Sequence, residues 1–63
     1  MGKIRRGGFV FITWIGDHGH HVHVYRDGRL VVRWNLDEGR PMEGRAKRRI
    51  VRLIMELKKE GRL

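Results

Sequence analysis

The sequence predicts an α+β protein, in which an antiparallel meander of three or four β-strands packs one face against a single C-terminal helix. Two observations support this prediction. Segments rich in β-branched and aromatic residues, separated by glycine-containing turns, fill the range 9–43. The range 45–60 instead repeats its apolar residues with helical spacing. A chain of 63 residues forms one domain at most, and its range 1–8 is expected to be a basic N-terminal arm.

The first expected strand, 9–15, is apolar on both faces, which is typical of a strand covered on both sides. After a turn at 16–19, the second strand, 20–25, alternates with the two-residue period of a strand that has one apolar and one polar face. The apolar face of this second strand carries Val22 and Val24. Its polar face carries His21, His23 and Tyr25.

The turn after this strand decides which side chains share a face of the sheet. A two-residue turn at Asp27-Gly28 would put the histidines on the same face as the apolar residues of the third strand, 29–36. A three-residue turn, with Gly28 left-handed in a bulge, would instead pair Val24 with Leu30 and His21 with Arg33. A slip of one residue moves every side chain to the other face, so hydrophobic matching predicts the three-residue turn.

A short fourth strand at 40–43 is expected next, with Pro41 suiting a sheet edge. The helix, 45–60, has one continuous apolar stripe that should cover the Val22 face, and Gly61 should follow its C-terminal end. The stripe consists of Ala46, Ile50, Leu53, Ile54 and Leu57. One helix covers one face only, so the face that carries the histidines is predicted to remain open.

Charge is the strongest functional signal in the chain. Lysine and arginine total 15 against 7 acidic residues, so the net charge is +8. An excess of this size favours a polyanionic partner: RNA, DNA or an acidic small protein. The absence of cysteine excludes disulfides and thiolate metal sites. Without an apolar segment long enough for a bilayer or a signal core, we expect a cytoplasmic protein with no membrane contact and no cofactor.

Two groups of residues are candidates for nucleic-acid binding. On the open face, bases could stack on aromatic side chains while an arginine meets phosphate. These residues are Trp14, Tyr25, His21, His23 and Arg33. At the start of the helix, where the helix dipole favours anions, Arg45, Arg48 and Arg52 are predicted to share one helical face.

Each group also has a structural interpretation. The open face could be a homodimer interface in which two sheets pack face to face. The positive charge at the start of the helix could be neutralised by the nearby acids Asp37, Glu38 and Glu43. The dimer and nucleic-acid hypotheses are compatible if the rim of the open face stays basic.

The histidines allow two further hypotheses. His21 and His23 are weak candidates for a Zn²⁺ or Ni²⁺ ligand pair, with His18 or His20 as a third ligand. The same pair could act as general base and acid in metal-independent RNA cleavage, with Arg33 stabilising the phosphorane. Half-buried histidines in an interface are the structural alternative. No paired carboxylates, glycine-rich phosphate loop or nucleophile motif are found, which favours a binding module over an enzyme.

The segment His20-His21-Val22-His23-Val24 precedes a charged hairpin, and 37–44 then leads into a C-terminal helix. This layout, over about 9–57, resembles the domain of unknown function family numbered 4160. The resemblance implies a small β-meander with one helix, often encoded beside a second small protein in a toxin–antitoxin-like pair. It matches His21 and His23 to the family's motif histidines and implies no activity. The chain departs from the family in its high arginine content and in ending at Leu63 without a longer helical tail.

Together these observations predict a small basic nucleic-acid-binding module, for RNA more than for DNA, that forms a homodimer and belongs to a toxin–antitoxin-like pair. The nucleic-acid prediction rests on charge and not on the family resemblance. The alternatives are a metal-independent RNA-cleaving enzyme and an interaction module for an acidic protein.

Overall fold

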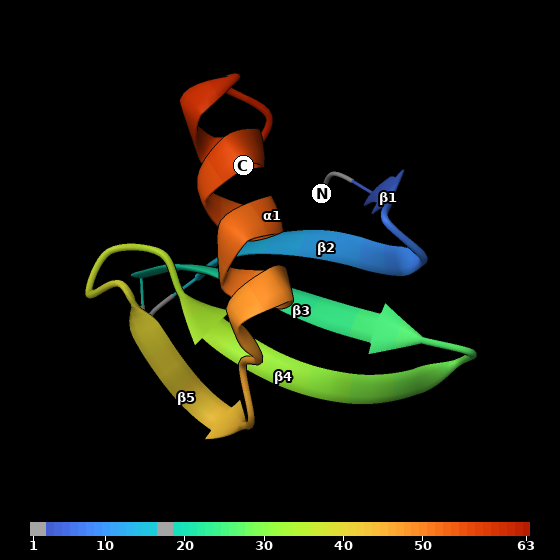
Figure 1. The fold of residues 1–63 in the computed structure, drawn as a ribbon. Helices are drawn as coiled ribbons and strands as arrows, with labels where there is room; N and C mark the ends of the chain where they lie inside the picture. Colours follow the sequence, from blue (N-terminus) through green and yellow to red (C-terminus); the bar gives the residue numbers. More distant parts are fainter. Residues whose placement is uncertain (1–2, 17–18) are drawn as a thin grey trace.

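The computed structural model describes residues 3–16 and 19–63. Its elements, in order, are β1 (Lys3–Arg6), β2 (Phe9–Gly16), β3 (Gly19–Arg26), β4 (Arg29–Asn35), β5 (Arg40–Gly44) and α1 (Arg48–Lys59). The five strands form one antiparallel sheet in chain order, and α1 lies on one of its faces (Figure 1). The predicted α+β meander with a C-terminal helix is therefore confirmed, although the expected count of three or four strands is too low.

The additional strand is β1, which occupies part of the range expected to be a basic arm. Gly7 and Gly8 take positive φ angles of 61° and 83°, so the chain turns tightly and returns as β2. Ile4 pairs with Phe11 and packs against the core. Arg6 donates hydrogen bonds of 2.6 and 3.0 Å to the carboxylate of Glu60, which joins β1 to the end of α1. The three positive charges among the four residues of β1 concealed this strand in the sequence.

The hairpin between β3 and β4 differs from the predicted three-residue turn. Its two central residues, Asp27 and Gly28, have positive φ angles of 52° and 76°, as in a type I′ turn. Arg26 and Arg29 pair directly on either side of them. The three-residue prediction is therefore wrong, because Asp-Gly suits the twist of a two-residue hairpin. The turn expected at 16–19 includes positions 17 and 18, which lie outside the described residues.

A bulge in β4 restores the hydrophobic matching that the two-residue turn alone would have lost. The turn pairs Tyr25 with Leu30, but Val24 pairs with Val32, so Val31 is an extra residue in β4. Because of the bulge, Val24 and Val32 both face the core. The expected pairing of Val24 with Leu30 is replaced, and Leu30 lies 42% exposed on the other face with Tyr25.

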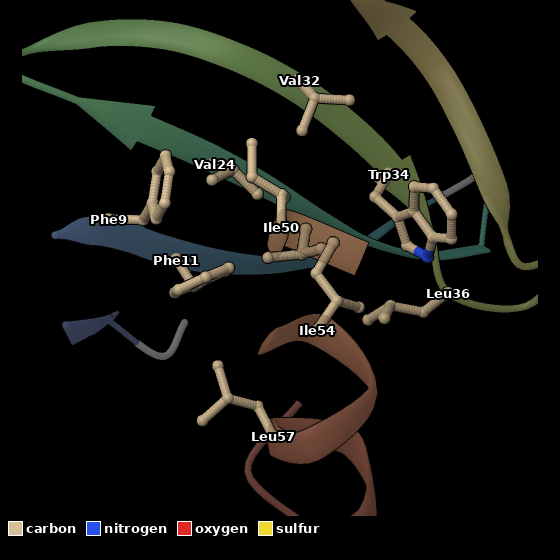
Figure 2. Packing of buried hydrophobic residues seen from close by; sticks show 10 residues of the cluster. Phe9, Phe11, Val24, Val32, Trp34, Leu36, Ile50, Ile54 and Leu57 are labelled. Atoms are coloured by element: carbon tan, nitrogen blue, oxygen red, sulfur yellow. The ribbon is translucent and has the colours of Figure 1, made fainter. Parts of the chain in front are cut away.

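The core lies between the sheet and α1, as Figure 2 shows. It consists of Phe9, Phe11, Val22, Val24, Val32, Trp34, Leu36, Ile50, Ile54 and Leu57. The predicted helical stripe is correct in its main members, because Ile50, Ile54 and Leu57 are almost completely buried. Within the described residues, no helix is long and apolar enough to cross a membrane.

The helix begins three residues later than expected. Gly44 ends β5 with φ 83°, and Lys47 is still extended, with φ −65° and ψ 155°. Arg45 therefore lies in the connection that precedes α1, and it does not share a helical face with Arg48 and Arg52. At the other end, the Gly61 amide bonds to the Lys58 carbonyl and the Arg62 amide to the Leu57 carbonyl, a Schellman cap.

Candidate nucleic-acid interface

The face of the sheet opposite α1 is built from three rows of directly paired residues. Antiparallel partners that lie opposite each other point to the same face, so each row crosses several strands. The rows are Arg5, Val10, Tyr25 and Leu30; Lys3, Ile12, His23, Arg33 and Glu43; and Trp14, His21, Asn35 and Arg40. We call this surface the open face. His21 and His23 thus lie on the side of β3 opposite to the buried Val22 and Val24.

Four rings pack together in the middle of the open face. The ring centroids of Trp14 and His23 are 5.5 Å apart, those of His21 and His23 5.3 Å, and those of His23 and Tyr25 6.4 Å. We call these four residues the aromatic cluster. Trp14 is 40% exposed, whereas Trp34, the other tryptophan of the chain, is 5% exposed beneath α1.

The surroundings of His23, the central ring of the aromatic cluster, favour its neutral form. Burial lowers the pKa of His23 from its ordinary value, and the charge of Arg33 and the neighbouring His21 lower it further, against a weaker opposite effect of Glu43. Arg33 donates a hydrogen bond of 3.2 Å to Glu43. Among residues 3–16 and 19–63, the buried nitrogens His21 Nδ1, His23 Nε2 and Arg33 Nε have no hydrogen-bond partner. The face therefore contains unused hydrogen-bonding groups beside its rings.

The structure separates the predicted nucleic-acid residues into two sets. Trp14, His21, His23, Tyr25 and Arg33 are gathered on the open face. Arg48 and Arg52 belong to α1, which lies on the other face of the sheet (Figure 1), and Arg45 lies in the connection between β5 and α1. The aromatic cluster and the arginines of α1 therefore belong to different sides of the sheet.

The acids proposed to neutralise the start of the helix have other partners. The Asp37 carboxylate accepts a hydrogen bond from the His20 amide, Glu38 pairs with Arg40, and Glu43 pairs with Arg33. In the described part of the chain, no ion pair reaches Arg48, and the first turn of α1 contains no acidic residue.

Sequence reasoning assigned Lys3 and Arg5 to an arm and so missed their place on the open face. Both are exposed, and neither forms an ion pair within the ranges 3–16 and 19–63. The alternation Lys-Ile-Arg before two glycines was the signal that could have identified a strand with a charged outer side.

The two hypotheses based on paired histidines gain little from the geometry. A group inserted between two rings needs about 7 Å between them, twice a van der Waals contact, whereas His21 and His23 stack at 5.3 Å. A phosphate therefore does not fit between the two imidazoles. Over the described residues, no cluster of three possible metal ligands is present. Alternation along β3 places His20 on the α1 side, and His18 lies outside the described residues.

Comparison of the chain with protein-family models, with curated proteins and with solved structures found no match. The resemblance to the domain of unknown function family 4160 stays a prediction.

Proposed function

We propose that this protein binds single-stranded nucleic acid, RNA in preference to DNA, on the open face. The aromatic cluster on an uncovered sheet face is the observation that supports this function best. Aromatic side chains on a sheet surface are a common platform for the splayed bases of single-stranded RNA. The net charge of +8 would add a strong, salt-dependent attraction to phosphate.

The ring spacings limit how a strand can bind. His21 and His23 stack with 5.3 Å between their ring centroids, and the tilted rings of His23 and Tyr25 lie 6.4 Å apart, so bases do not fit between them. Bases would instead stack on the outer surfaces of the cluster, at the exposed Trp14 and at Tyr25. The unpartnered imidazole nitrogens would meet base edges after a small rotation, and Lys3, Arg5 and Arg33 would meet phosphates.

The direct test measures fluorescence anisotropy of labelled single-stranded RNA, single-stranded DNA and duplex RNA. Stacking of one base on an aromatic side chain contributes roughly 1–3 kcal/mol, so Trp14→Leu should weaken single-strand binding about tenfold or more. The matched control is Met55→Leu, which changes an apolar side chain of similar exposure on α1. Equal affinity of Trp14→Leu and the unchanged protein would contradict the proposal.

Salt dependence provides a second test. If three cations of the open face neutralise three phosphates, the log–log slope of affinity against salt should be about −2 for single strands. A slope close to zero would exclude binding by phosphate contact.

The two tryptophans allow the site to be located by intrinsic fluorescence. Bound bases should quench the exposed Trp14 and leave the buried Trp34 unaffected. Trp14→Phe should therefore remove the quenching while retaining the Trp34 signal. Quenching that survives in this variant would place the ligand on the α1 side.

Pairing with a second copy is the other use that the open face supports. Trp14 and Leu30 are 40% and 42% exposed on it, and two sheets can pack face to face at about 10 Å. Sedimentation with and without RNA tests the homodimer. A dimer that dissociates when RNA is added would use the open face, and a dimer that persists would use another surface.

An acidic protein partner, as in a toxin–antitoxin-like pair, is the remaining alternative to RNA. Pull-down with nuclease treatment distinguishes the two, since only a protein partner would be retained. The same RNA-binding reactions also test cleavage. Any cleavage by the histidine pair should disappear in the double variant His21→Ala with His23→Ala, while binding through Trp14 and the cations is weakened but still measurable.

A further inference from the structure

A hollow of about 300 Å³ opens on the open face beside the edge strand β1. Its lining comes from β1, β2 and β3 and from the β3–β4 turn: Lys3, Arg5, Val10, Ile12, Tyr25 and Gly28. The strand register explains this set, because Arg5, Val10 and Tyr25 lie in one row and Lys3 and Ile12 pair in the next.

The chemistry of the hollow changes from one end to the other. Val10 and Ile12 form an apolar floor, and Tyr25 supplies an aromatic wall. Lys3 and Arg5 stand on β1, two strand spacings or about 10 Å from β3. None of the six lining residues is acidic, and neither cation forms an ion pair within the described chain. The hollow therefore suits a ligand with a flat apolar end and an anionic end.

We propose that this hollow binds the phosphorylated end of the nucleic-acid strand, with the terminal base against Tyr25 and the terminal phosphate between Lys3 and Arg5. This inference rests on the proposed function and specifies one subsite of it. A terminal phosphate carries about −1.5 to −2 charges at pH 7, which matches two unpaired cations, whereas a phosphodiester within a strand carries only one. The position at β1, beyond which the sheet has no further strand, is suited to a strand end.

The test compares three uridine hexamers, with a 5′-phosphate, with a 3′-phosphate or with hydroxyl groups at both ends. One of the two phosphorylated hexamers should bind about tenfold more tightly than the hydroxyl form, because charge-assisted hydrogen bonds are the strong ones. Lys3→Gln with Arg5→Gln should abolish this difference. The control pair Lys47→Gln with Arg52→Gln removes the same charge from exposed positions on the α1 side and should preserve it.

The aromatic wall is tested separately. Tyr25→Phe keeps the ring and should preserve the preference for a phosphorylated end, whereas Tyr25→Leu should reduce the affinity of all three hexamers. Equal binding of the three hexamers by the unchanged protein would overturn the inference. So would a loss of the preference in the control pair as large as in the Lys3 and Arg5 pair.

Failure of this inference and failure of the proposed function give different results. If the hydroxyl hexamer binds in a manner that depends on Trp14 and the phosphate adds nothing, only the strand-end site is wrong. If no hexamer binds, both are wrong. If uridine monophosphate alone binds as tightly as the phosphorylated hexamer, the ligand is a free nucleotide and the assignment to a strand end is overturned.

Discussion

His23 on β3 lies directly opposite Arg33 on β4, at the centre of the open face. Two positive charges in directly opposed positions on neighbouring strands repel each other. The structure avoids this repulsion in two ways. His23 has a lowered pKa and is neutral at pH 7, and Arg33 extends toward Glu43 on the next strand. The stability of the sheet should therefore depend on the protonation of one imidazole.

We expect the free energy of unfolding to fall as the pH is lowered from 7.5 to 5.5. The pKa of His23 is below its ordinary value of 6.5 in the folded chain, so the unfolded chain takes up this proton at a higher pH than the folded chain does. The contribution of neutral His23 is fully present above about pH 6.5 and is lost as the pH falls through the range below it. Urea denaturation at a series of pH values measures this loss.

The variant His23→Gln should flatten this pH dependence, since glutamine does not titrate at this position. The control variant His20→Gln should retain it, because His20 lies on the other side of β3. An unchanged slope in His23→Gln would show that another group causes the loss of stability.

Gly44→Ala should destabilise the fold more than Gly28→Ala. Both glycines have positive φ angles, 83° and 76°, at which an alanine costs about 1–2 kcal/mol. A methyl group at position 28 would enter open space, whereas one at position 44 would collide with the carbonyl oxygen of Val31. Gly44 pairs with Val32 beside the bulge, so the strands would have to separate.

We expect Gly44→Ala to cost about 2–5 kcal/mol in total, from strain and overpacking. Thermal and chemical denaturation of the two variants test this difference. Equal destabilisation would mean that the close approach of β4 and β5 at Gly44 does not exist in solution.

Truncation of the helical stripe should remove much of the stability of the fold. Ile54→Ala removes a completely buried side chain and should cost about 2–5 kcal/mol. A domain of this length has roughly 3–9 kcal/mol of stability in total. The neighbouring Met55→Ala changes a side chain that is 45% exposed and should stay within about 0.5 kcal/mol of the unchanged protein. If urea denaturation showed Met55→Ala to be the less stable of the two variants, the face of α1 that packs against the sheet would be the one that carries Met55 and not Ile54.

Arg48→Glu should stabilise the helix. Arg48 is the first residue of α1, no side chain caps this end, and the first turn has no acidic residue. A carboxylate near the positive end of the helix dipole contributes about 0.3–1 kcal/mol at low salt, and the dipole penalty on the arginine is removed as well. Lys59→Glu, in the last turn, should have the opposite sign, and thermal denaturation at low salt compares the two.

Arg48→Glu also tests which side of the molecule binds RNA. Since Arg48 lies on the α1 side, Arg48→Glu should reduce RNA affinity much less than Trp14→Leu. A loss as large as that of Trp14→Leu would move the nucleic-acid site from the open face to α1 and refute the proposed function.

Much of the architecture could be predicted because neighbouring residues already encode it. The two-residue period of 20–25 places Val22 and Val24 on one face of the strand and His21 and His23 on the other, independently of the rest of the chain. The period of 50–57 likewise defines the buried side of α1. In contrast, β1 was missed because three of its four side chains are charged, and Ile4 is part of the packed structure only through its pairing with Phe11 and its contact with the core.

The candidate site was predictable in part for the same reason. The alternation identified the aromatic cluster, but Lys3 and Arg5 joined the open face only through pairing of β1 with β2. Arg45, Arg48 and Arg52 had seemed equivalent candidates in a linear sequence. In the structure, Arg48 and Arg52 belong to α1, on the covered face of the sheet, whereas the aromatic cluster lies on the open face.

The sequence by itself determined the α+β class, the helical stripe and the division of β3 into an apolar and an imidazole side, because covalent geometry imposes those periods locally. Only the tertiary structure decided the two-residue turn with its compensating bulge, the fifth strand and the side of the sheet on which each cation lies. These depend on pairing between segments distant in the chain, where the bulge at Val31 makes the turn preferred by Asp27-Gly28 compatible with hydrophobic burial against α1.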